Sequence, residues 1–356
     1  MEKPRREGEG SSLVCPRCKH YFASRSEHIF RCDLCDLEYP VRFGIPDLRY
    51  PRPVVVDSES RKIRHLANHF ETSSYDDLLK RFLSLPDFDH LPPEVIERVY
   101  MHRKNQLQQG TAFTKMFLAK LQSHFTLPNT DQALEIGCGA GAGLVSLSKI
   151  YDQVVGLDPD LANLLLARKF CIENGVVNFQ LVQAYGQFLP YQSSQFTYVT
   201  AQNVLEHVFD VDEVTHEIAR VLIAEGCFTA DSRNRYDLFF PEPHVEVRWV
   251  GLLPRRFAKD YVRWRTGLDY SEMHAHLLSY GDLKHALVQA FGDSWRIVVP
   301  DVSAYGFPSS ADTILSRIGM IAPLNAIFTR LFPSHLALAQ ENSLIPTEKR
   351  HLSSAN

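Results

Sequence analysis

The stretch Ala133–Gly143, "ALEIGCGAGAG", places four glycines at alternate positions directly after a short apolar run. These are Gly137, Gly139, Gly141 and Gly143. Glycine loses more backbone freedom on folding than any other residue, so it is costly within regular structure. The pattern therefore predicts a backbone that turns sharply after a strand and lies close to a ligand or to another segment of the chain.

The chain on both sides of this loop alternates between strand-like and helical segments. Strand-like runs occupy residues 132–136, 153–158, 177–183, 196–201 and 226–231, with helical patterns between them at 143–150, 160–175 and 210–222. A later helix is expected at 281–291, followed by strands at 295–300 and 335–340. Such alternation predicts right-handed crossovers and a parallel sheet covered on both faces. Ligands of such sheets bind outside the carboxyl ends of the strands, where the glycines lie.

Three ligands suit a glycine-rich turn at that edge: a phosphate, a dinucleotide and S-adenosylmethionine. A phosphate-binding P-loop needs Gly-Lys-Ser/Thr, which does not follow here. The dinucleotide pattern G-x-G-x-x-G fails because residue 142 is Ala. What remains is Glu135 two residues before the first glycine, in the pattern E-x-G-x-G-x-G. Asp158 ends the next strand, about 20 residues past the loop, where a carboxylate can accept hydrogen bonds from both ribose hydroxyls.

These motifs resemble those of class I S-adenosylmethionine-dependent methyltransferases. The stretches "FLPYQSSQFTYVTAQNVLEHV" and "RVLIAEGCF" resemble the fourth strand and the passage into the fifth in the methyltransferase type 11 branch, which includes ubiquinone-biosynthesis-type enzymes. The resemblance covers roughly residues 110–235 and implies an α/β, Rossmann-like seven-stranded sheet with helices on both faces. The alternative is another nucleotide-binding fold with a chance glycine loop.

The resemblance also implies roles for individual residues. Glu135 and the first three glycines would shape the pocket for the methionine end of the cofactor, and Asp158 would hold its ribose. Pro159 would lie beside the adenine, and Gln202 and Asn203 near the sulfonium. The implied cofactor-binding set is Glu135, Gly137, Gly139, Gly141, Asp158, Pro159, Tyr185, Gln202 and Asn203.

One residue departs from the family pattern. Family members usually read "GDAxxLPF" before the fourth strand, with the acid contacting the adenine amino group. This chain reads "AYGQFLPY", which puts Tyr185 in the place of the acid. A tyrosine can stack or donate a hydrogen bond, but it is not a carboxylate acceptor. Either Gln183 or Gln187 compensates, or the departure marks a methyltransferase-like scaffold without catalysis.

Four of the seven cysteines form a separate pattern near the start of the chain. "CPRC" and "CDLC" together read C-x2-C-x13-C-x2-C, with ligand candidates Cys15, Cys18, Cys32 and Cys35. Each C-x2-C places two thiolates on one tight turn, and two such turns close a tetrahedral zinc site. Four protein ligands leave no open position, so the pattern predicts a structural Zn2+. A redox pair is the alternative, although a thioredoxin-like motif has one C-x-x-C in a βαβ context.

The segment after these cysteines, "LEYPVRFGIPDL", extends the pattern. It resembles the end of the zinc-ribbon activator subunit of tRNA and rRNA methyltransferases, and the zinc ribbon fused to many bacterial methyltransferases. Such a ribbon docks on and stabilises its neighbour, recognises a substrate or binds a partner. Docking is the interpretation that needs the fewest assumptions.

A basic and aromatic segment follows the predicted fifth strand, where this branch builds its acceptor pocket. Its basic residues are Arg248, Arg255, Arg256, Lys259, Arg263 and Arg265, and its aromatic residues are Trp249, Phe257, Tyr261 and Trp264. Such a segment can bind a phosphate-bearing substrate, stack on a sugar or base, or lie on a membrane surface. The alternative is an amphipathic helix with its aromatics packed inward. If the acceptor is a hydroxyl, His244 and Glu246 are the candidate general bases, with His274 and His276 behind them.

Composition bounds these interpretations. The chain has 356 residues, a formal net charge of −4 and 45% hydrophobic residues, so it has a core but no global basic field for nucleic acid. No secretory signal or membrane-spanning run is recognised, which predicts a cytoplasmic protein. The predicted segments are a disordered lead at 1–12, a zinc ribbon at 13–50, a linker with helices at 51–128, a methyltransferase domain at 129–340 with a substrate insertion at 232–280, and a disordered tail at 341–356.

The sequence thus predicts an S-adenosylmethionine-dependent methyltransferase with a structural zinc ribbon. The expected acceptor is a small molecule or a lipid- or glycan-linked intermediate, and peripheral membrane contact is compatible with it. An RNA methyltransferase that uses the ribbon to bind RNA, and a non-catalytic scaffold, are the two alternatives. The oligomeric state is not predicted.

Overall fold

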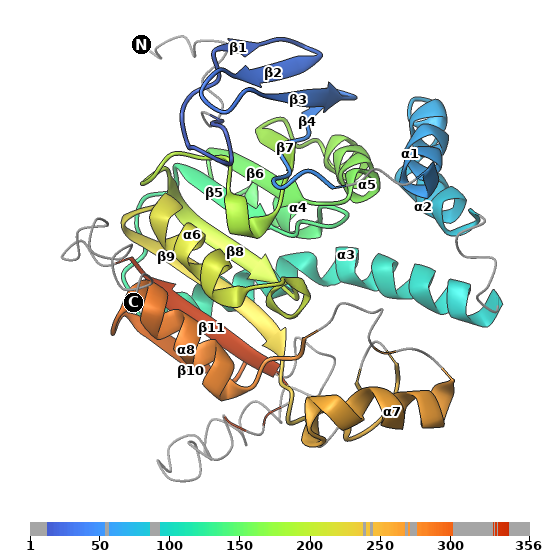
Figure 1. Cartoon of the computed structure of the whole chain (residues 1–356), viewed down its shortest axis with the longest axis vertical. Coiled ribbons are helices and arrows are strands. Elements are labelled where there is room, and N and C mark those ends of the chain that lie inside the picture. The colour runs from blue at the N-terminus through green and yellow to red at the C-terminus, as the bar shows by residue number, and fades with distance from the viewer. Residues whose placement is uncertain are drawn as a thin grey trace. The chain divides into compact units, whose positions relative to one another are not determined.

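A computed structural model describes residues 13–53, 57–85, 93–237, 240–242, 245–267, 270, 276–301, 330, 332 and 334–341. Two sheets organise these residues (Figure 1). The first has four strands in the order β1-β2-β3-β4, and the second has seven in the order β10-β11-β9-β8-β5-β6-β7. The expected α/β fold with a seven-stranded sheet is therefore confirmed.

The small sheet is built from short antiparallel strands near the start of the chain. They are β1 (Ser24–Arg25), β2 (Ile29–Cys32), β3 (Leu37–Arg42) and β4 (Ile45–Pro46). Their buried side chains include Phe22 and Tyr39, whose rings lie 5.7 Å apart edge to face. So small a core does not hold a fold of this size by itself, which is why such modules depend on metals.

Three helices precede the large sheet: α1 (Asp57–His69), α2 (Tyr75–Leu83) and α3 (Pro93–Gln122). The helix α2 begins with a capping box, in which the Ser74 hydroxyl accepts from the backbone of Asp77 and Asp77 returns the bond. Its apolar face is buried, and the Tyr75 ring packs at 5.1 Å against Phe170 of the following α/β region. The helical segment predicted between the ribbon and the sheet is present.

The glycine-rich stretch lies in a regular βαβαβ succession. It comprises β5 (Gln132–Ile136), α4 (Ala142–Leu147), β6 (Gln153–Asp158), α5 (Leu161–Glu173) and β7 (Phe179–Gln183). β5, β6 and β7 pair in parallel, as the alternation of patterns predicts. The strand β8 (Phe196–Gln202) and the helix α6 (Val211–Val221) follow.

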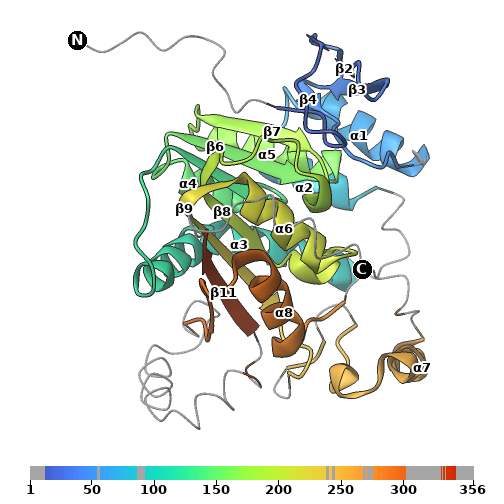
Figure 2. The same cartoon turned by 60° about the vertical axis from the view of Figure 1, so that its left-hand side comes forward.

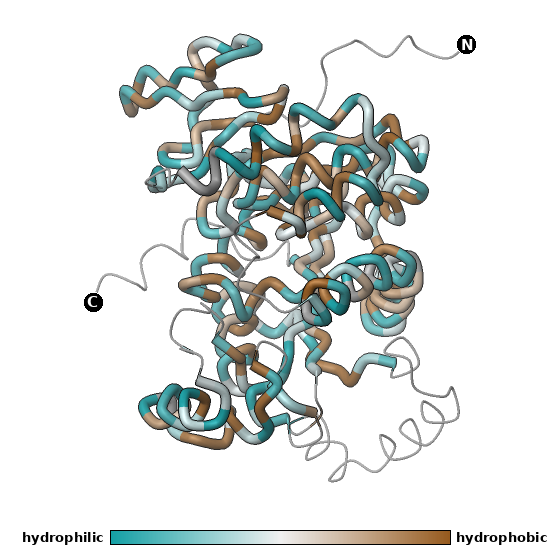
Figure 3. The backbone as a smooth tube through the Cα atoms, turned by 90° about the vertical axis from the view of Figure 1, so that its right-hand side faces the viewer, coloured by the Kyte–Doolittle hydropathy of each residue, from teal (hydrophilic) through white to brown (hydrophobic). Residues whose placement is uncertain are grey.

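The last part of the sheet is antiparallel. It contains β9 (Leu222–Arg233), β10 (Trp295–Val298) and β11 (Ser334–Gln340), and β11 pairs antiparallel with both neighbours. The parallel pairing predicted for the alternating segments does not extend to these late strands, whose direction the sequence left open, because a period-two pattern identifies a strand without its direction. Hydrophobic and hydrophilic residues interleave along the helices in Figure 3.

The chain divides into two compact units. The first holds residues up to 114, 129–199 and 220–223, and the second holds 115–128, 200–219 and 224 onward. Within the second unit, α7 (Arg255–Thr266) precedes α8 (Tyr280–Phe291), which lies beside β11 in both Figure 1 and Figure 2. Among the described residues, no helix has the length and hydropathy that crossing a lipid bilayer requires.

Candidate functional site

The glycine loop crosses the carboxyl end of β6. The N–H groups of Gly137 and Cys138 both donate to the Leu157 carbonyl, at 2.7 and 3.0 Å. Gly137, Gly139 and Gly141 have φ of +67°, +49° and +90°, a region that side chains disfavour. A Cβ on Gly139 would meet nothing within 4 Å, so there is open space over the loop at this point. The loop is therefore a bare backbone cradle with room for a ligand.

The fourth glycine serves a different purpose. Gly143 lies in the first turn of α4, and a Cβ there would stand 2.1 Å from Oε1 of Glu135. The Glu135 side chain is 4% exposed, and its Oε2 has no hydrogen-bond partner among the described residues. Burial, with the nearby Asp158 carboxylate as a second cause, raises the pKa of Glu135 to about 8. A buried carboxyl group with a spare oxygen suits the positively charged amino-acid end of a ligand.

Asp158 lies directly against the glycine loop. Its Oδ2 accepts a hydrogen bond from the Gly139 N–H at 3.0 Å, and its Oδ1 accepts from the Asp160 N–H at 2.9 Å. Burial raises the pKa of Asp158 to about 6, although these N–H groups favour the charged form. At neutral pH the group is therefore an anchored carboxylate, with lone pairs left for hydroxyl donors.

The candidates for replacing the missing acid lie at the end of β7 and just after it. Gln183 is fully buried; its Nε2 donates to the Pro159 carbonyl at 2.9 Å, and its Oε1 accepts from Arg42 at 3.4 Å. Gln183 is thus already engaged and does not replace the missing acid. Tyr185 is half-buried at the start of a short 3-10 turn, Gly186–Phe188, and Gln187 is half-buried within that turn.

Gln202 and Asn203 lie at the end of β8, in the second unit. Asn203 has φ of +51°, and its N–H donates to Oδ1 of the buried Asp231 at 3.0 Å. Asp231 thereby holds the left-handed turn that contains Asn203, a residue whose predicted place near the sulfonium stays a prediction. Sequence reasoning did not single out Asp231, because an acid inside a strand-like run carries no motif.

A small, open cavity lies just after β9, also in the second unit, and its volume of about 10 Å³ is room for roughly one water molecule. Its lining includes Arg233, Phe240, Glu242 and Trp249, so it is built largely from the predicted insertion. Among the described residues, the Arg233 guanidinium makes only a cation–π contact, 5.8 Å from the Phe240 ring. The sequence pattern did not identify Arg233, the last residue of β9, or the buried Glu242, because neither lies in a motif.

Of the two candidate bases, the structure describes only Glu246. His244 lies outside the described residues, as does His274. Glu246 is exposed on a turn with φ of +54°, and it is not among the lining residues. A general-base role for His244 or Glu246 stays a prediction.

The basic and aromatic segment forms the helix α7 and the turn before it. Ala258 and Val262, one turn apart, are buried against a small cluster of valines that includes Val250. Phe257 and Trp264 are 50% and 76% exposed, and Trp249 in the preceding turn is 56% exposed. The alternative in which the aromatics pack inward therefore fails for these three, because the small residues of α7 occupy its buried face.

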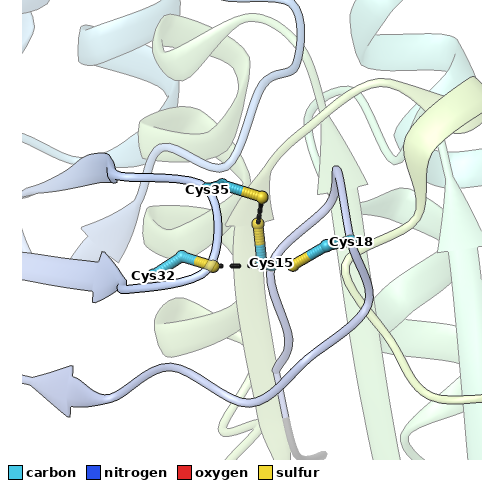
Figure 4. Close-up of side chains that lie close together, drawn as sticks. All are labelled: Cys15, Cys18, Cys32 and Cys35. Carbon is cyan, nitrogen blue, oxygen red and sulfur yellow. Dashed lines mark hydrogen bonds between the residues drawn. The ribbon is translucent and has the colours of Figure 1, made fainter.

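The four cysteines come together at two turns of the small sheet, as Figure 4 shows. All four sulfur atoms lie within 4.8 Å of one another, with Cys18 to Cys32 at 3.5 Å and Cys15 to Cys35 at 4.0 Å. These separations exceed a disulfide bond of about 2 Å. They bracket the separation of about 3.8 Å that a tetrahedral Zn2+ with bonds of about 2.3 Å imposes. The cluster therefore has the donor set and the spacing of a closed zinc site.

Comparisons with known proteins agree with this geometry. Residues 134–230 match the model of a family described as "Methyltransferase domain". An uncharacterized methyltransferase of Bacillus subtilis, YcgJ, is 28% identical over 165 residues, which cover 46% of this chain and 63% of that protein. The ubiquinone biosynthesis O-methyltransferase of Bradyrhizobium diazoefficiens is 29% identical over 208 residues, covering 55% of this chain and 78% of that enzyme. The first match thus spans less than two thirds of its relative.

Solved structures include the crystal structure of YcgJ, with a TM-score of 0.41 at 18% identity over 64% of this chain and 99% of that one. Phosphoethanolamine N-methyltransferase 2 of Haemonchus contortus has a TM-score of 0.44 at 15% identity, covering 64% of this chain and 53% of that one. Residues 134–230 therefore have the sequence of a methyltransferase domain.

Proposed function

We propose that this protein transfers a methyl group from S-adenosylmethionine. The observation that carries the proposal is the hydrogen bond of 3.0 Å from the Gly139 N–H to the Asp158 carboxylate. It places the carboxylate beside the glycine loop, which has open space next to Gly139. The residues fit the cofactor at both ends. The spare, buried oxygen of Glu135 suits an ammonium group, and the anchored carboxylate of Asp158 suits the ribose hydroxyls.

The bound cofactor supplies an electrophilic methyl group, which an acceptor displaces in line. The contribution of the chain is positional. The bare backbone of the glycine loop lets the cofactor approach closely. Asp158 orients the sugar, and Pro159 presents an exposed ring surface beside it. Within the second unit, Asp231 holds the turn at Asn203 in one conformation.

Calorimetry with S-adenosylhomocysteine tests the proposal. The wild type should bind, and Asp158→Ala should weaken binding about 100-fold, because two charge-assisted hydrogen bonds are lost. Asp152→Ala is the matched control, since Asp152 is exposed just before the opposite end of the same strand. No binding by the wild type would favour the scaffold interpretation that Tyr185 raises, and equal affinity of both variants would contradict the assigned pocket.

For the acceptor, we propose a lipid-linked intermediate that is reached at an anionic membrane surface. Two features of the second unit support this class. The cavity after β9 is lined by Arg233, whose guanidinium can bind an anionic headgroup, and by the apolar side chains of Phe240 and Trp249. The helix α7 exposes Phe257 and Trp264 among arginines.

The charge of this segment differs from that of the whole chain. Residues 248–265 carry six Lys and Arg against a single acid, Asp260, whereas the chain as a whole is at −4. Each Lys or Arg near an anionic bilayer contributes about 1 kcal/mol of attraction, and exposed aromatic rings partition into the headgroup region. RNA, the alternative partner, would bind the same arginines through its phosphates. It would use the aromatic side chains only if its bases stacked on them.

Vesicle flotation distinguishes these partners. Phosphatidylglycerol-containing vesicles should retain the wild type at about physiological salt, and neutral phosphatidylcholine vesicles should not. The double variant Phe257→Ser/Trp264→Ser should lose retention. Phe209→Ser is the control, because Phe209 is 86% exposed but is followed by Asp210 and Asp212. Absence of retention, or tight RNA binding that these serines abolish, would contradict the lipid proposal.

A further inference from the structure

The cysteine ribbon contacts one segment of the methyltransferase core repeatedly, and that segment borders the cofactor pocket. The segment is residues 183–192, which begins at the end of β7 and contains Tyr185. Ribbon and segment both belong to the first unit. At the start of the ribbon, Leu13 forms an antiparallel bridge with Tyr191, and the Val14 N–H donates to the Pro190 carbonyl at 2.9 Å.

The first cysteine turn continues this contact. Lys19, which follows Cys18, extends its Nζ to the Leu189 carbonyl at 3.0 Å, while Gln192 donates to the Lys19 carbonyl at 2.8 Å. Lys19 has φ of +60°, a conformation that the tight turn between Cys15 and His20 imposes. The geometry of a metal-bound turn is therefore transmitted directly to the backbone of the 183–192 segment.

The end of the ribbon contacts the other end of the segment. Asp47 forms a parallel bridge with Gln183, and the Leu48 N–H donates to the Gln183 carbonyl at 2.7 Å. The Tyr50 ring meets the Phe188 ring edge-on at 5.2 Å. The chain after β4 thus lies along the free edge of β7, which the fold would otherwise leave unpaired.

A buried ion-pair network joins this contact to the pocket. Asp47 accepts two hydrogen bonds of 2.8 Å from the Arg49 guanidinium and one of 2.6 Å from Arg42. The third nitrogen of Arg49 lies 3.4 Å from the Pro159 carbonyl, which Gln183 also contacts. Burial alone would raise the pKa of Asp47, but the two guanidinium groups outweigh it and leave that pKa lowered. Arg49, with 5% of its side chain exposed, is held in one position.

We propose that the ribbon is a wall of the cofactor site and that Arg49 and Asp47 are positioning residues for its adenosine half. Through Pro159 and the 183–192 segment, they fix the surface on which the adenine lies next to Asp158. This inference rests on the proposed methyl-donor function. It also predicts a specific effect of zinc loss. Without metal, the cysteine turns should no longer hold the adenosine half of the pocket, while the glycine loop stays intact.

Substitution of Arg49 separates this role from general stability. Arg49→Gln removes the fork that binds Asp47, and Arg31→Gln is the control, because Arg31 makes an exposed ion pair with Glu38 on the ribbon. We expect Arg49→Gln to weaken binding of S-adenosylhomocysteine and of adenosine by the same factor, about tenfold, the effect of losing one buried charged contact. Equal factors are expected because the methionine end is untouched.

Two further measurements complete the test. Amide hydrogen exchange should accelerate within residues 183–192 in Arg49→Gln at an unchanged melting temperature, and not in Arg31→Gln. Chelation of the metal from the full chain, followed by mass spectrometry to show its loss, should lower adenosine affinity to a similar extent. Wild-type affinity in a folded Arg49→Gln protein, or after complete metal loss, would overturn the inference and leave the methyl-donor function standing. If the wild type binds no S-adenosylhomocysteine, the proposed methyl-donor function itself is contradicted.

Discussion

The region around Asp158 and the helix α7 differ in which side chains they bury. Around Asp158 the acids are buried: Asp158, Asp47 and Glu135 are each less than 10% exposed, and backbone N–H groups or arginines hold the first two. On α7, by contrast, Arg256 and Arg265 are exposed, and so are the rings of Phe257 and Trp264. The first arrangement fixes one ligand in one geometry, whereas the second leaves surface energy available for a partner.

The helices α2 and α7 show the same contrast. Both α2 and α7 carry aromatic residues at helical spacing. In α2 the aromatic positions Tyr75 and Phe82 are buried, and in α7 Phe257 and Trp264 are exposed while Ala258 and Val262 are buried. Spacing alone therefore identifies an amphipathic helix but not which of its faces the core takes.

The largest expected effect tests the buried acids. The pKa of Glu135 is about 8 in the folded protein against 4.5 as the ordinary value, so the folded state keeps a proton that the unfolded state loses. Its stabilisation is present at low pH and is lost as pH rises through about 8. The free energy of unfolding of the ligand-free wild type should thus fall by up to about 4 kcal/mol between pH 5 and pH 9.

Urea denaturation across this range measures that loss, with Glu135→Gln as the comparison. The variant should be nearly flat above pH 7 and keep a smaller slope between about pH 4 and pH 6 from Asp158, whose pKa is raised to about 6. Equal slopes for both proteins above pH 7 would show that Glu135 is ionised in the fold.

The next effect tests the packing behind the glycine loop. Gly143→Ala places a Cβ 2.1 Å from the Glu135 carboxyl oxygen, so the variant should lose about 3 kcal/mol of stability. Gly139→Ala is the control without a clash, because its Cβ would meet no atom within 4 Å, and it should lose only the roughly 1 kcal/mol of strain that its φ of +49° causes. Thermal denaturation of both measures the difference. Adding Glu135→Ala to Gly143→Ala should recover part of the loss, and no recovery would place the clash elsewhere.

A smaller effect probes the one family feature that this chain lacks. Tyr185→Asp places an acid at the predicted adenine edge, and we expect S-adenosylhomocysteine affinity to rise about tenfold, the value of one hydrogen bond to a charged group. The control is Tyr21→Asp, which makes the same change at an exposed position of the ribbon. Unchanged affinity on calorimetry would mean that Tyr185 already performs the role of the acid.

The smallest effect is expected on the exposed side. Trp264 is 76% exposed, so Trp264→Ser should change the free energy of unfolding by less than about 0.5 kcal/mol. Val262→Ser, two residues earlier and fully buried, should cost several times more. Urea denaturation of the two variants measures this ratio. A large loss in Trp264→Ser would show that α7 packs its aromatics after all and would weaken the membrane proposal.

The glycine loop and its contact with Asp158 could be predicted from the sequence, because they depend on backbone conformation and on residue spacing. A strand, four glycines and an acid one crossover later appear in order, and the structure brings Gly139 and Asp158 within hydrogen-bond distance. The cysteine spacing was readable for the same reason. The acceptor side was not: Arg233 and Glu242 follow no pattern, and the candidate Glu246 does not line the cavity.

By itself, the sequence determined the α/β class, the glycine cradle and the four-cysteine cluster, since each rests on residues near in the chain whose conformational needs are local. Only the tertiary structure decided that Gln183 is engaged by the ribbon, that β11 runs antiparallel to β9, and that Arg49 contacts Pro159. These depend on pairings between residues far apart in the chain, and their burial, rather than their identity, sets their energy.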